Sequence, residues 1–148
     1  MATFKHRMTR NGNAIGVFFH RVLKGRVDAF GDQKVLMLTS PGRRTGIPRS
    51  VMVRFLDHDG GYLVWGSGSG SPTEPDWFRN LRRASRARVE IGTASTEVVP
   101  QVLAGAERDR VWRDVVLAAV PGVAKYEAKA GRIIPVAVLR PVDVTPPR

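Results

Sequence analysis

The chain has 148 residues, no cysteine, and 24 Lys and Arg residues against 13 Asp and Glu, which gives a formal net charge of +11. This length is typical of one domain, and 43% hydrophobic residues are enough to bury a core, so the chain is not merely a disordered basic tail. The lack of cysteine excludes a disulfide framework, a thiolate nucleophile and a cysteine-ligated metal, and the scattered histidines share no ligand spacing, so we expect no metal site.

Residues 13–24 have the pattern of an amphipathic basic helix. Their apolar residues recur at spacings of three and four, and the charged residues lie on the remaining faces. The apolar residues are Ile15, Phe18, Phe19, Val22 and Leu23. The run is shorter than the roughly 20 residues of a membrane span, and no small-residue cleavage site follows it, so it is not a signal peptide. Such a helix docks on its own domain, lies on an anionic membrane or covers a bound ligand.

From residue 34 onward, most of the chain has strand patterns. Runs of apolar and β-branched residues predict strands at 35–39, 49–56, 62–65, 88–92, 96–103 and 133–139. Pro41-Gly42 and the run from Asp57 to Gly61 are strong turn signals that join the first three strands as hairpins.

Helical patterns interrupt these hairpins at residues 76–84, 106–120 and 124–130. They do not alternate with strands as the β-α-β units of a parallel sheet would. We therefore expect a mainly β (α+β) fold, an antiparallel barrel with helical insertions and a groove at its surface. Residues 1–148 form a single domain in this interpretation, with a flexible start at 1–12 and a proline-rich tail at 142–148.

The positive charge is concentrated in the first 88 residues and is mostly guanidinium. The net charge is +5 over residues 1–34, +5 over residues 35–88 and +1 over residues 89–148, and 19 of the 24 basic residues are Arg. Arg binds phosphate or carboxylate through a planar, bidentate fork. A GC-rich genome would also raise the Arg content, but it would not explain the segregation along the chain. The distribution therefore favours an anionic partner.

The loop at residues 42–49 carries three of these guanidinium groups between two predicted strands. Its sequence is Gly-Arg-Arg-Thr-Gly-Ile-Pro-Arg, and its glycines let successive backbone N–H groups form an anion-binding concavity. We interpret it as a phosphate-binding loop, with a solvated basic turn as the alternative. It has neither the Gly-Lys-Ser/Thr ending of a Walker loop nor a Gly-x-Gly-x-x-Gly fingerprint.

Residues 67–71 read Ser-Gly-Ser-Gly-Ser, a composition typical of flexible linkers. Because a linker is not expected between a strand and a helix of one domain, we expect a loop whose backbone approaches a ligand closely. In the following helix, Trp77 and Asn80 lie three residues apart on one face. They would supply an aromatic wall and a hydrogen-bonding amide, although Trp77 as a plain core residue is an equal alternative.

The motifs that carry a family resemblance are Val35-Leu36-Met37-Leu38-Thr39, Gly42-Arg43-Arg44-Thr45-Gly46 with Arg49, Ser67, Pro75-Asp76-Trp77-Phe78-Arg79-Asn80-Leu81, and Tyr126 with Arg132-Ile133-Ile134-Pro135-Val136. In this combination and order they resemble the deazaflavin (F420)-dependent nitroreductase family. The resemblance covers about residues 14–141. It implies a split β-barrel of the FMN-binding type.

The resemblance also implies coenzyme F420 as the cofactor, an 8-hydroxy-5-deazaflavin with a phosphate and an acidic oligoglutamate tail held among basic residues. The residues that it places at the phosphate are Arg43, Arg44, Thr45, Gly46 and Arg49. Those that it places around the deazaflavin ring are Ser67, Gly68, Trp77 and Asn80.

The implied reaction is the transfer of a hydride from the reduced coenzyme to a small electron-poor acceptor. Family members that reduce nitroaromatic compounds have tyrosines before the final strand. Here Tyr126 matches one of them, but Val120 and Val123 stand at two others. The loss of two hydroxyl donors favours a quinone or an enone over a nitro compound. Tyr126 is the candidate proton donor, with a core role as the alternative.

Two other functions stay open from the residues alone. One is a split barrel that binds FMN or another cofactor, and the other is a non-catalytic binder of nucleic acid or of an anionic membrane. Aromatic residues do not alternate with the basic stretch as stacking platforms would, which argues against nucleic acid. We predict a cytoplasmic enzyme, monomeric or homodimeric, with contact to the inner membrane face through residues 13–24 as an open alternative.

Overall fold

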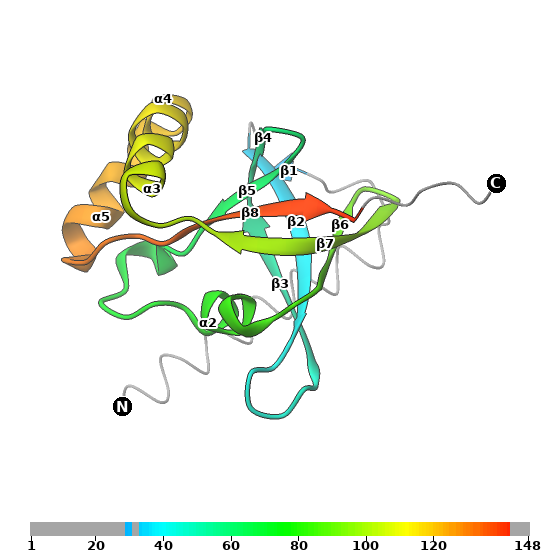
Figure 1. The fold of residues 1–148 in the computed structure, drawn as a ribbon. Coiled ribbons are helices and arrows are strands. Elements are labelled where there is room, and N and C mark those ends of the chain that lie inside the picture. Colours follow the sequence, from blue (N-terminus) through cyan, green and yellow to red (C-terminus); the bar gives the residue numbers. More distant parts are fainter. Residues whose placement is uncertain (1–28, 31–32, 143–148) are drawn as a thin grey trace.

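The computed structural model describes residues 29–30 and 33–142 (Figure 1). The predicted helix at 13–24 with its membrane contact, the flexible start at 1–12 and residues 143–148 of the tail lie outside these residues. The strands are β1 (Ala29–Phe30), β2 (Gln33–Pro41), β3 (Pro48–Arg54), β4 (Leu56–His58), β5 (Gly61–Trp65), β6 (Ala87–Ile91), β7 (Ala94–Val102) and β8 (Val136–Pro141). The helices are α2 (Asp76–Arg83), α3 (Gly105–Val111), α4 (Leu117–Ala119) and α5 (Ala124–Ala130), with a π-helical turn at Trp112–Val116 and 3-10 turns at Gly68–Gly70 and Pro121–Val123.

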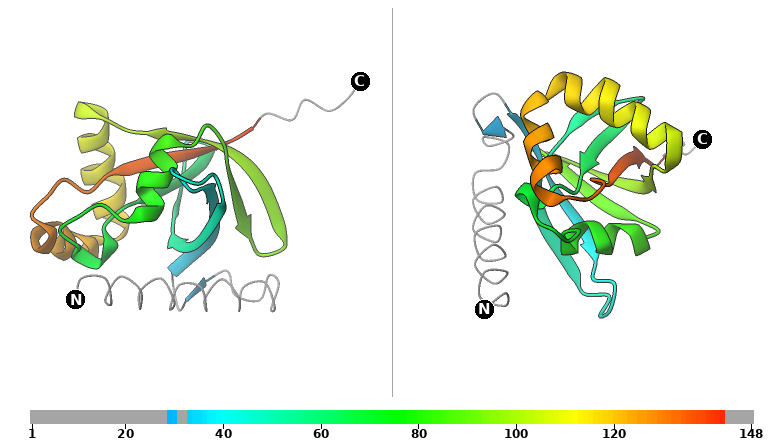
Figure 2. Two further views of the ribbon diagram at one scale, coloured as in Figure 1. Left: turned by 90° about the horizontal axis from the view of Figure 1, so that it is seen from below. Right: turned by 90° about the vertical axis from the view of Figure 1, so that its left-hand side faces the viewer.

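The antiparallel sheet curls because its two end strands are one piece of chain. Hydrogen-bonded neighbours follow the order β3-β2-β6-β7-β8-β5-β4. Only Phe55 separates β3 from β4, and its N–H donates to the carbonyl of Lys34 in β2 (N···O 3.2 Å). The chain thus passes directly from one end of this series to the other, and Figures 1 and 2 show the resulting curled sheet. The predicted antiparallel, split-barrel fold is confirmed.

The interior of the curled sheet is filled by the inward-facing residues of alternating strands. These are Leu36, Leu38, Val51, Phe55, Val64, Ala87, Val89, Val98, Ala137 and Leu139. Phe78 and Leu81 of α2 belong to the same cluster and are both 0% exposed. One face of α2 is therefore buried against the barrel interior, which fixes the position of this helix.

A second cluster lies on the outer face of β5 and β8. Trp65 and Val136 from these strands pack with Trp112 and Val116 of the π-helical turn and with Val123. The segment 105–130 covers this side of the sheet, as both views of Figure 2 show. The barrel thus has an apolar interior and one helix-covered outer wall.

Two predicted elements differ from the structure. The last strand begins at Val136, and Ile133, expected in a buried strand, is 73% exposed. The carbonyls of Ile134 and Pro135 instead accept hydrogen bonds from the Arg108 side chain and from the Gly66 N–H, so this stretch is bound to α3 and to the residue after β5. The predicted α-helix at 106–120 is interrupted by the π-helical turn, for which the sequence pattern gave no signal.

We expect Phe78→Ala to lower the free energy of unfolding by about 3–5 kcal/mol, because it leaves a cavity where α2 meets the barrel interior. Denaturant unfolding measures the change. Ile133→Ala is the matched control, since a side chain that is 73% exposed should shift stability by less than about 0.5 kcal/mol. Similar small effects of both variants would contradict the role given to α2.

Candidate functional site

The loop between β2 and β3 is a tight turn closed by its own hydrogen bonds. The N–H of Gly42 donates to the carbonyl of Ile47 and the N–H of Gly46 to the carbonyl of Gly42, both at 2.8 Å. Gly46 has a φ of +73°, a conformation that strains any other residue. The Ile47 N–H donates to the Thr45 hydroxyl (3.2 Å). Within the described part of the chain, the N–H groups of Arg44 and Thr45 have no acceptor, so an anion here would meet two adjacent donors.

Arg43 is the only predicted phosphate ligand whose guanidinium is already bound within the described residues. Its backbone N–H and its Nη1 both donate to Oδ1 of Asn80 (3.1 and 2.8 Å), and its Nη2 lies 3.2 Å from Oδ1 of Asp76. The Arg43 side chain is only 19% exposed. Arg43 therefore fastens the tip of the hairpin to α2, a contact that spans 37 residues of sequence.

Arg44 and Arg49 differ from Arg43 in their exposure and in their hydrogen-bond partners. Both are exposed, and neither has a carboxylate partner among residues 33–142. Charge-assisted, bidentate bonds to phosphate need such uncommitted guanidinium groups. Of the three predicted phosphate ligands, these two are the ones without a carboxylate partner in the described part, whereas Arg43 positions the loop that carries them.

The Gly-Ser loop is organised around the guanidinium of Arg132. Nε of Arg132 donates to the Ser71 carbonyl (3.0 Å), and Nη2 lies within 3.3 Å of the carbonyls of Gly66, Ser67 and Thr73. Nη1 is buried without a partner in the described part. Burial lowers the pKa of Arg132, which the Glu74 carboxylate opposes and the nearby Arg79 charge reinforces. The loop is thus a fixed structure and not a flexible linker.

The glycines of this loop serve internal packing. A Cβ on Gly66 would lie 3.0 Å from both Phe78 and Pro135, and one on Gly70 would lie 2.7 Å from Lys129. At these two glycines, close contact with α2, with Pro135 just before β8 and with α5 therefore takes the place of the expected approach of the backbone to a ligand. Ser67 is half-buried, and Gly68 beside it is exposed with a φ of +54°.

The two residues of α2 that were predicted to line the cofactor pocket, Trp77 and Asn80, have different surroundings. Asn80 is 7% exposed, and its Oδ1 is taken by Arg43, so its amide positions the loop. Trp77 is partly buried against the interior cluster and meets Phe78 edge-on, with ring centroids 5.3 Å apart. The structure thus gives Trp77 the packing of a core residue on one side and partial exposure on the other.

The two valines that replace tyrosines have different surroundings. Val123 is 1% exposed and belongs to the cluster beneath the helices. Val120 instead lines a hollow of about 220 Å³. Tyr126 is half-buried, with the Lys125 ammonium 5.4 Å from its ring centre. Of these three residues, Val120 is the one that lines this hollow.

This hollow was not recognised from the sequence, because its walls come from elements far apart in the chain. Its lining residues are Lys34, Arg54, Phe55, Leu56, Trp65, Ala119 and Val120. Phe55 and Trp65 are 5% and 7% exposed and supply an aromatic floor. Lys34 is paired with Asp57 (3.1 Å), whereas Arg54 has no carboxylate partner in the described part. The hollow combines apolar surface with one uncommitted cation.

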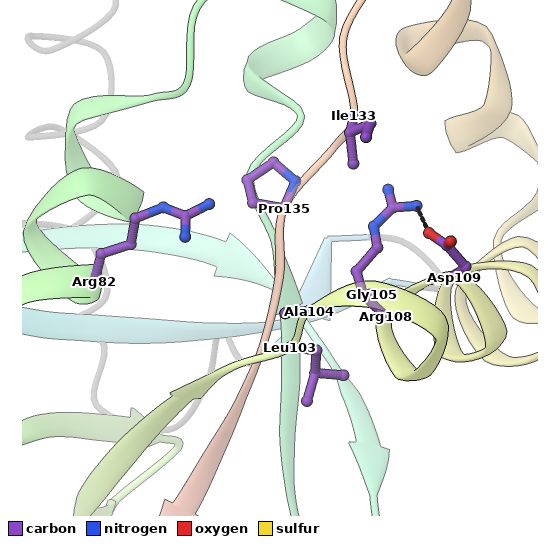
Figure 3. A pocket seen from close by; sticks show the side chains of 8 residues that line it. All are labelled: Arg82, Leu103, Ala104, Gly105, Arg108, Asp109, Ile133 and Pro135. Atoms are coloured by element: carbon purple, nitrogen blue, oxygen red, sulfur yellow. Dashed lines mark hydrogen bonds and ion pairs between the residues drawn. The ribbon is translucent and has the colours of Figure 1, made fainter.

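A second hollow, of about 270 Å³, lies between α2, the start of α3 and the segment before β8 (Figure 3). Its charges are internally paired. Arg82 binds Glu74 through both Nε and Nη2, which raises the pKa of Arg82, and buried Arg108 donates to Asp109 and to the Ile134 carbonyl. Because both guanidinium groups are already bound, this hollow has few free hydrogen-bond donors for an anion.

The family model of F420H(2)-dependent quinone reductases matches residues 15–141 of the chain. The chain belongs to this family. An F420H(2)-dependent quinone reductase of Mycobacterium tuberculosis is 26% identical over 106 residues, covering 70% of this chain and 71% of that protein. The solved structure of an F420-H2-dependent reductase, FDR-A, is 27% identical, with a TM-score of 0.63 over 72% of this chain and 93% of its own.

Two further solved structures extend the comparison. One, described as a domain-swapped dimer, is 26% identical, with a TM-score of 0.65 over 85% of this chain and 96% of its own. The other, the haem storage protein HutZ of Vibrio cholerae, is 18% identical with a TM-score of 0.51 over 76% of this chain and 84% of its own, and shows the fold alone.

As a member of the F420H(2)-dependent quinone reductase family, the chain is an oxidoreductase whose cofactor is coenzyme F420. The predicted family, enzyme class and cofactor are confirmed, and F420 is favoured over FMN. The residues present fit the coenzyme, since Arg44, Arg49 and the two loop N–H groups that have no acceptor in the described residues suit a phosphate. Among the described residues, no helix is long and apolar enough to cross a membrane. The same residues contain no group of three or more His, Asp or Glu side chains that could hold a metal ion.

We expect Asn80→Ala to weaken F420 binding and to cost about 1–3 kcal/mol of stability, because Arg43 loses the acceptor that ties the hairpin to α2. Fluorescence titration with F420 and denaturant unfolding measure the two effects. Ser85→Ala, at an exposed serine just beyond α2, is the control. Lower stability with unchanged F420 affinity would show that the contact between Arg43 and Asn80 does not position the β2–β3 loop for the coenzyme.

Arg132→Lys tests the organisation of the Gly-Ser loop. Lysine keeps the charge but cannot reach four carbonyls with a planar fork. We expect amide hydrogen exchange to accelerate in residues 66–73 and the free energy of unfolding to fall by about 1–3 kcal/mol. Arg110→Lys, on the exposed face of α3, is the matched control. Unchanged exchange in the loop would contradict the role of Arg132.

Proposed function

We propose that this member of the family reduces a quinone, with the quinone ring seated in the hollow bordered by Trp65, Arg54 and Val120. The observation that carries the proposal is this combination of an aromatic, apolar floor with the Arg54 guanidinium, which has no carboxylate partner among residues 33–142. A quinone has a flat carbocyclic ring for such a floor and carbonyl oxygens for the guanidinium. The relative from Mycobacterium tuberculosis, described as a quinone reductase, supports the same acceptor class.

The phosphate of the coenzyme would be held by Arg44 and Arg49, with the N–H groups of Arg44 and Thr45 as further donors. Arg43, fixed by Asn80 and Asp76, keeps this loop against α2. Ser67, in the loop held by Arg132, would lie beside the deazaflavin. The bound coenzyme supplies a hydride, and the protein's task is to fix the two partners and to exclude water.

Addition of a hydride to a quinone leaves a negative charge on a quinone oxygen. Arg54, and Lys34 beside it, would stabilise this charge by Coulomb attraction and hydrogen bonding. A proton then completes the hydroquinone. Tyr126 is our candidate for the proton donor, because it belongs to α5, and this helix packs against the Gly68–Gly70 turn next to Ser67.

Enones and nitro compounds are weaker candidates as acceptors. Both also accept a hydride, but Val120 gives the hollow an apolar wall where a tyrosine would offer a hydroxyl donor to a nitro group. We expect the order quinone, enone, nitro compound in kcat/KM. The oligomeric state, monomer or homodimer, stays a prediction.

The test is the oxidation of F420H2, followed by absorbance, with menadione, 2-cyclohexenone and a nitroimidazole as acceptors. We expect the highest kcat/KM with menadione. Arg54→Gln should lower this value about 10-fold, the equivalent of one charge-assisted hydrogen bond, while leaving F420 affinity unchanged.

Arg110→Gln removes an equal charge on α3, away from the hollow, and serves as the control. Faster turnover of the enone or the nitro compound would overturn the choice of quinone. An Arg54→Gln variant with full menadione activity would overturn the placement of the acceptor in this hollow.

A further inference from the structure

The hollow bordered by Val120 has two cations on its described walls. Lys34 and Arg54 line it, and none of the described lining residues is Asp or Glu. The two cations lie on neighbouring strands, since Arg54 ends β3 and the next residue, Phe55, donates its N–H to the carbonyl of Lys34 in β2. Reduction of a quinone develops one negative charge, which the Arg54 guanidinium alone is able to bind. The Lys34 ammonium therefore remains for a second anionic group.

Lys34 differs from Arg54 in its exposure and in its partner. Its Nζ lies 3.1 Å from Oδ2 of Asp57 in β4, and the two side chains are 64% and 66% exposed. Such an exposed ion pair contributes little to stability, because water solvates both ions well when they separate. The exchange of Asp57 for another carboxylate therefore costs little. Arg54 is half-buried and has no carboxylate partner among residues 33–142.

The floor and the size of the hollow limit what an acidic ligand could look like. Phe55 and Trp65 are 5% and 7% exposed, so a ring lying on them excludes water from one side of the hollow, where a charge pair is then stronger. The volume is about 220 Å³, whereas pockets for drug-sized ligands have roughly 300–1,000 Å³. The hollow thus suits a ring with a short charged substituent better than a ring with a long apolar chain.

We propose that this hollow selects aromatic acceptors that carry a carboxylate, and that Lys34 is the residue that recognises the carboxylate. The ring would lie on Phe55 and Trp65, with a quinone oxygen at Arg54. The carboxylate would replace Asp57 on Lys34, so that Asp57 is a counter-ion that an acidic acceptor displaces. The inference rests on the quinone site given under Proposed function and names the class of acceptor that this site prefers.

The test compares a naphthoquinone that carries a propionate side chain with the methyl ester of the same compound. The two share their ring and differ in charge, so the ratio of their affinities isolates the effect of the carboxylate. With oxidised F420 bound, no hydride is available, and calorimetry measures binding alone. We expect the acid to bind about 3- to 5-fold more tightly at low salt, as one exposed ion pair allows. Because the carboxylate is remote from the carbon that takes the hydride, the same factor should appear in KM with F420H2, with similar kcat.

Two variants change the partner of the carboxylate in opposite directions. Lys34→Gln should bring the affinities of acid and ester together, whereas Asp57→Asn, which frees Lys34, should increase the preference for the acid. Arg110→Gln and Asp114→Asn are the controls and should keep the preference, since neither residue lines the hollow. Asp114 matches Asp57 because it is also an exposed carboxylate paired with a cation, Arg113.

Equal affinities for acid and ester in the unmodified protein would overturn the carboxylate site, and so would a preference for the acid that survives Lys34→Gln. Failure of the proposed function would give a different result. The acid would then still bind more tightly than its ester in the presence of oxidised F420, but neither compound would oxidise F420H2. Because Lys34 is exposed, Lys34→Gln keeps the fold, which circular dichroism verifies.

Discussion

The site depends on the burial of one face of α2 in the barrel. Phe78 and Leu81 are inaccessible to solvent there, and the cost of exposing them fixes the rotation of the helix about its axis. With that rotation set, Asp76 and Asn80 must face the β2–β3 hairpin. Arg43 then has partners for both its backbone and its guanidinium, and the hairpin tip is held in place. Hydrophobic packing therefore orients the polar site.

The arginines divide into structural and uncommitted groups. Arg43, Arg108 and Arg132 are bound to carbonyls, an amide or carboxylates, and they fasten loops to helices. Arg44 and Arg49 have no such partners in the described residues. A guanidinium with all donors used stabilises the protein, whereas one with free donors remains available to an anion. Some arginines of this basic chain are thus used in folding, whereas the two on the β2–β3 loop remain available to an anion.

Local patterns predicted most of the fold because hairpins and short helices are determined by neighbouring residues. The strand at 62–65 and the helix at 124–130 agree with the structure within one residue at each end. Ile133 was wrongly placed in a strand. Its apolar character does not reveal that the carbonyls of the next two residues, Ile134 and Pro135, bind Arg108 and the Gly66 N–H. The π-helical turn at Trp112–Val116 likewise depends on packing that no local pattern encodes.

The sequence by itself determined the family, the cofactor and the basic loop, because these are carried by residue types at short, fixed spacings. From the sequence alone, Arg43, Arg44 and Arg49 were equivalent candidates for binding the phosphate. Only the tertiary structure distinguished them, since the partner of Arg43 lies 37 residues away on α2. The hollow floored by Phe55 and Trp65 is also a tertiary feature, because it exists only once distant strands and the end of α4 meet around it.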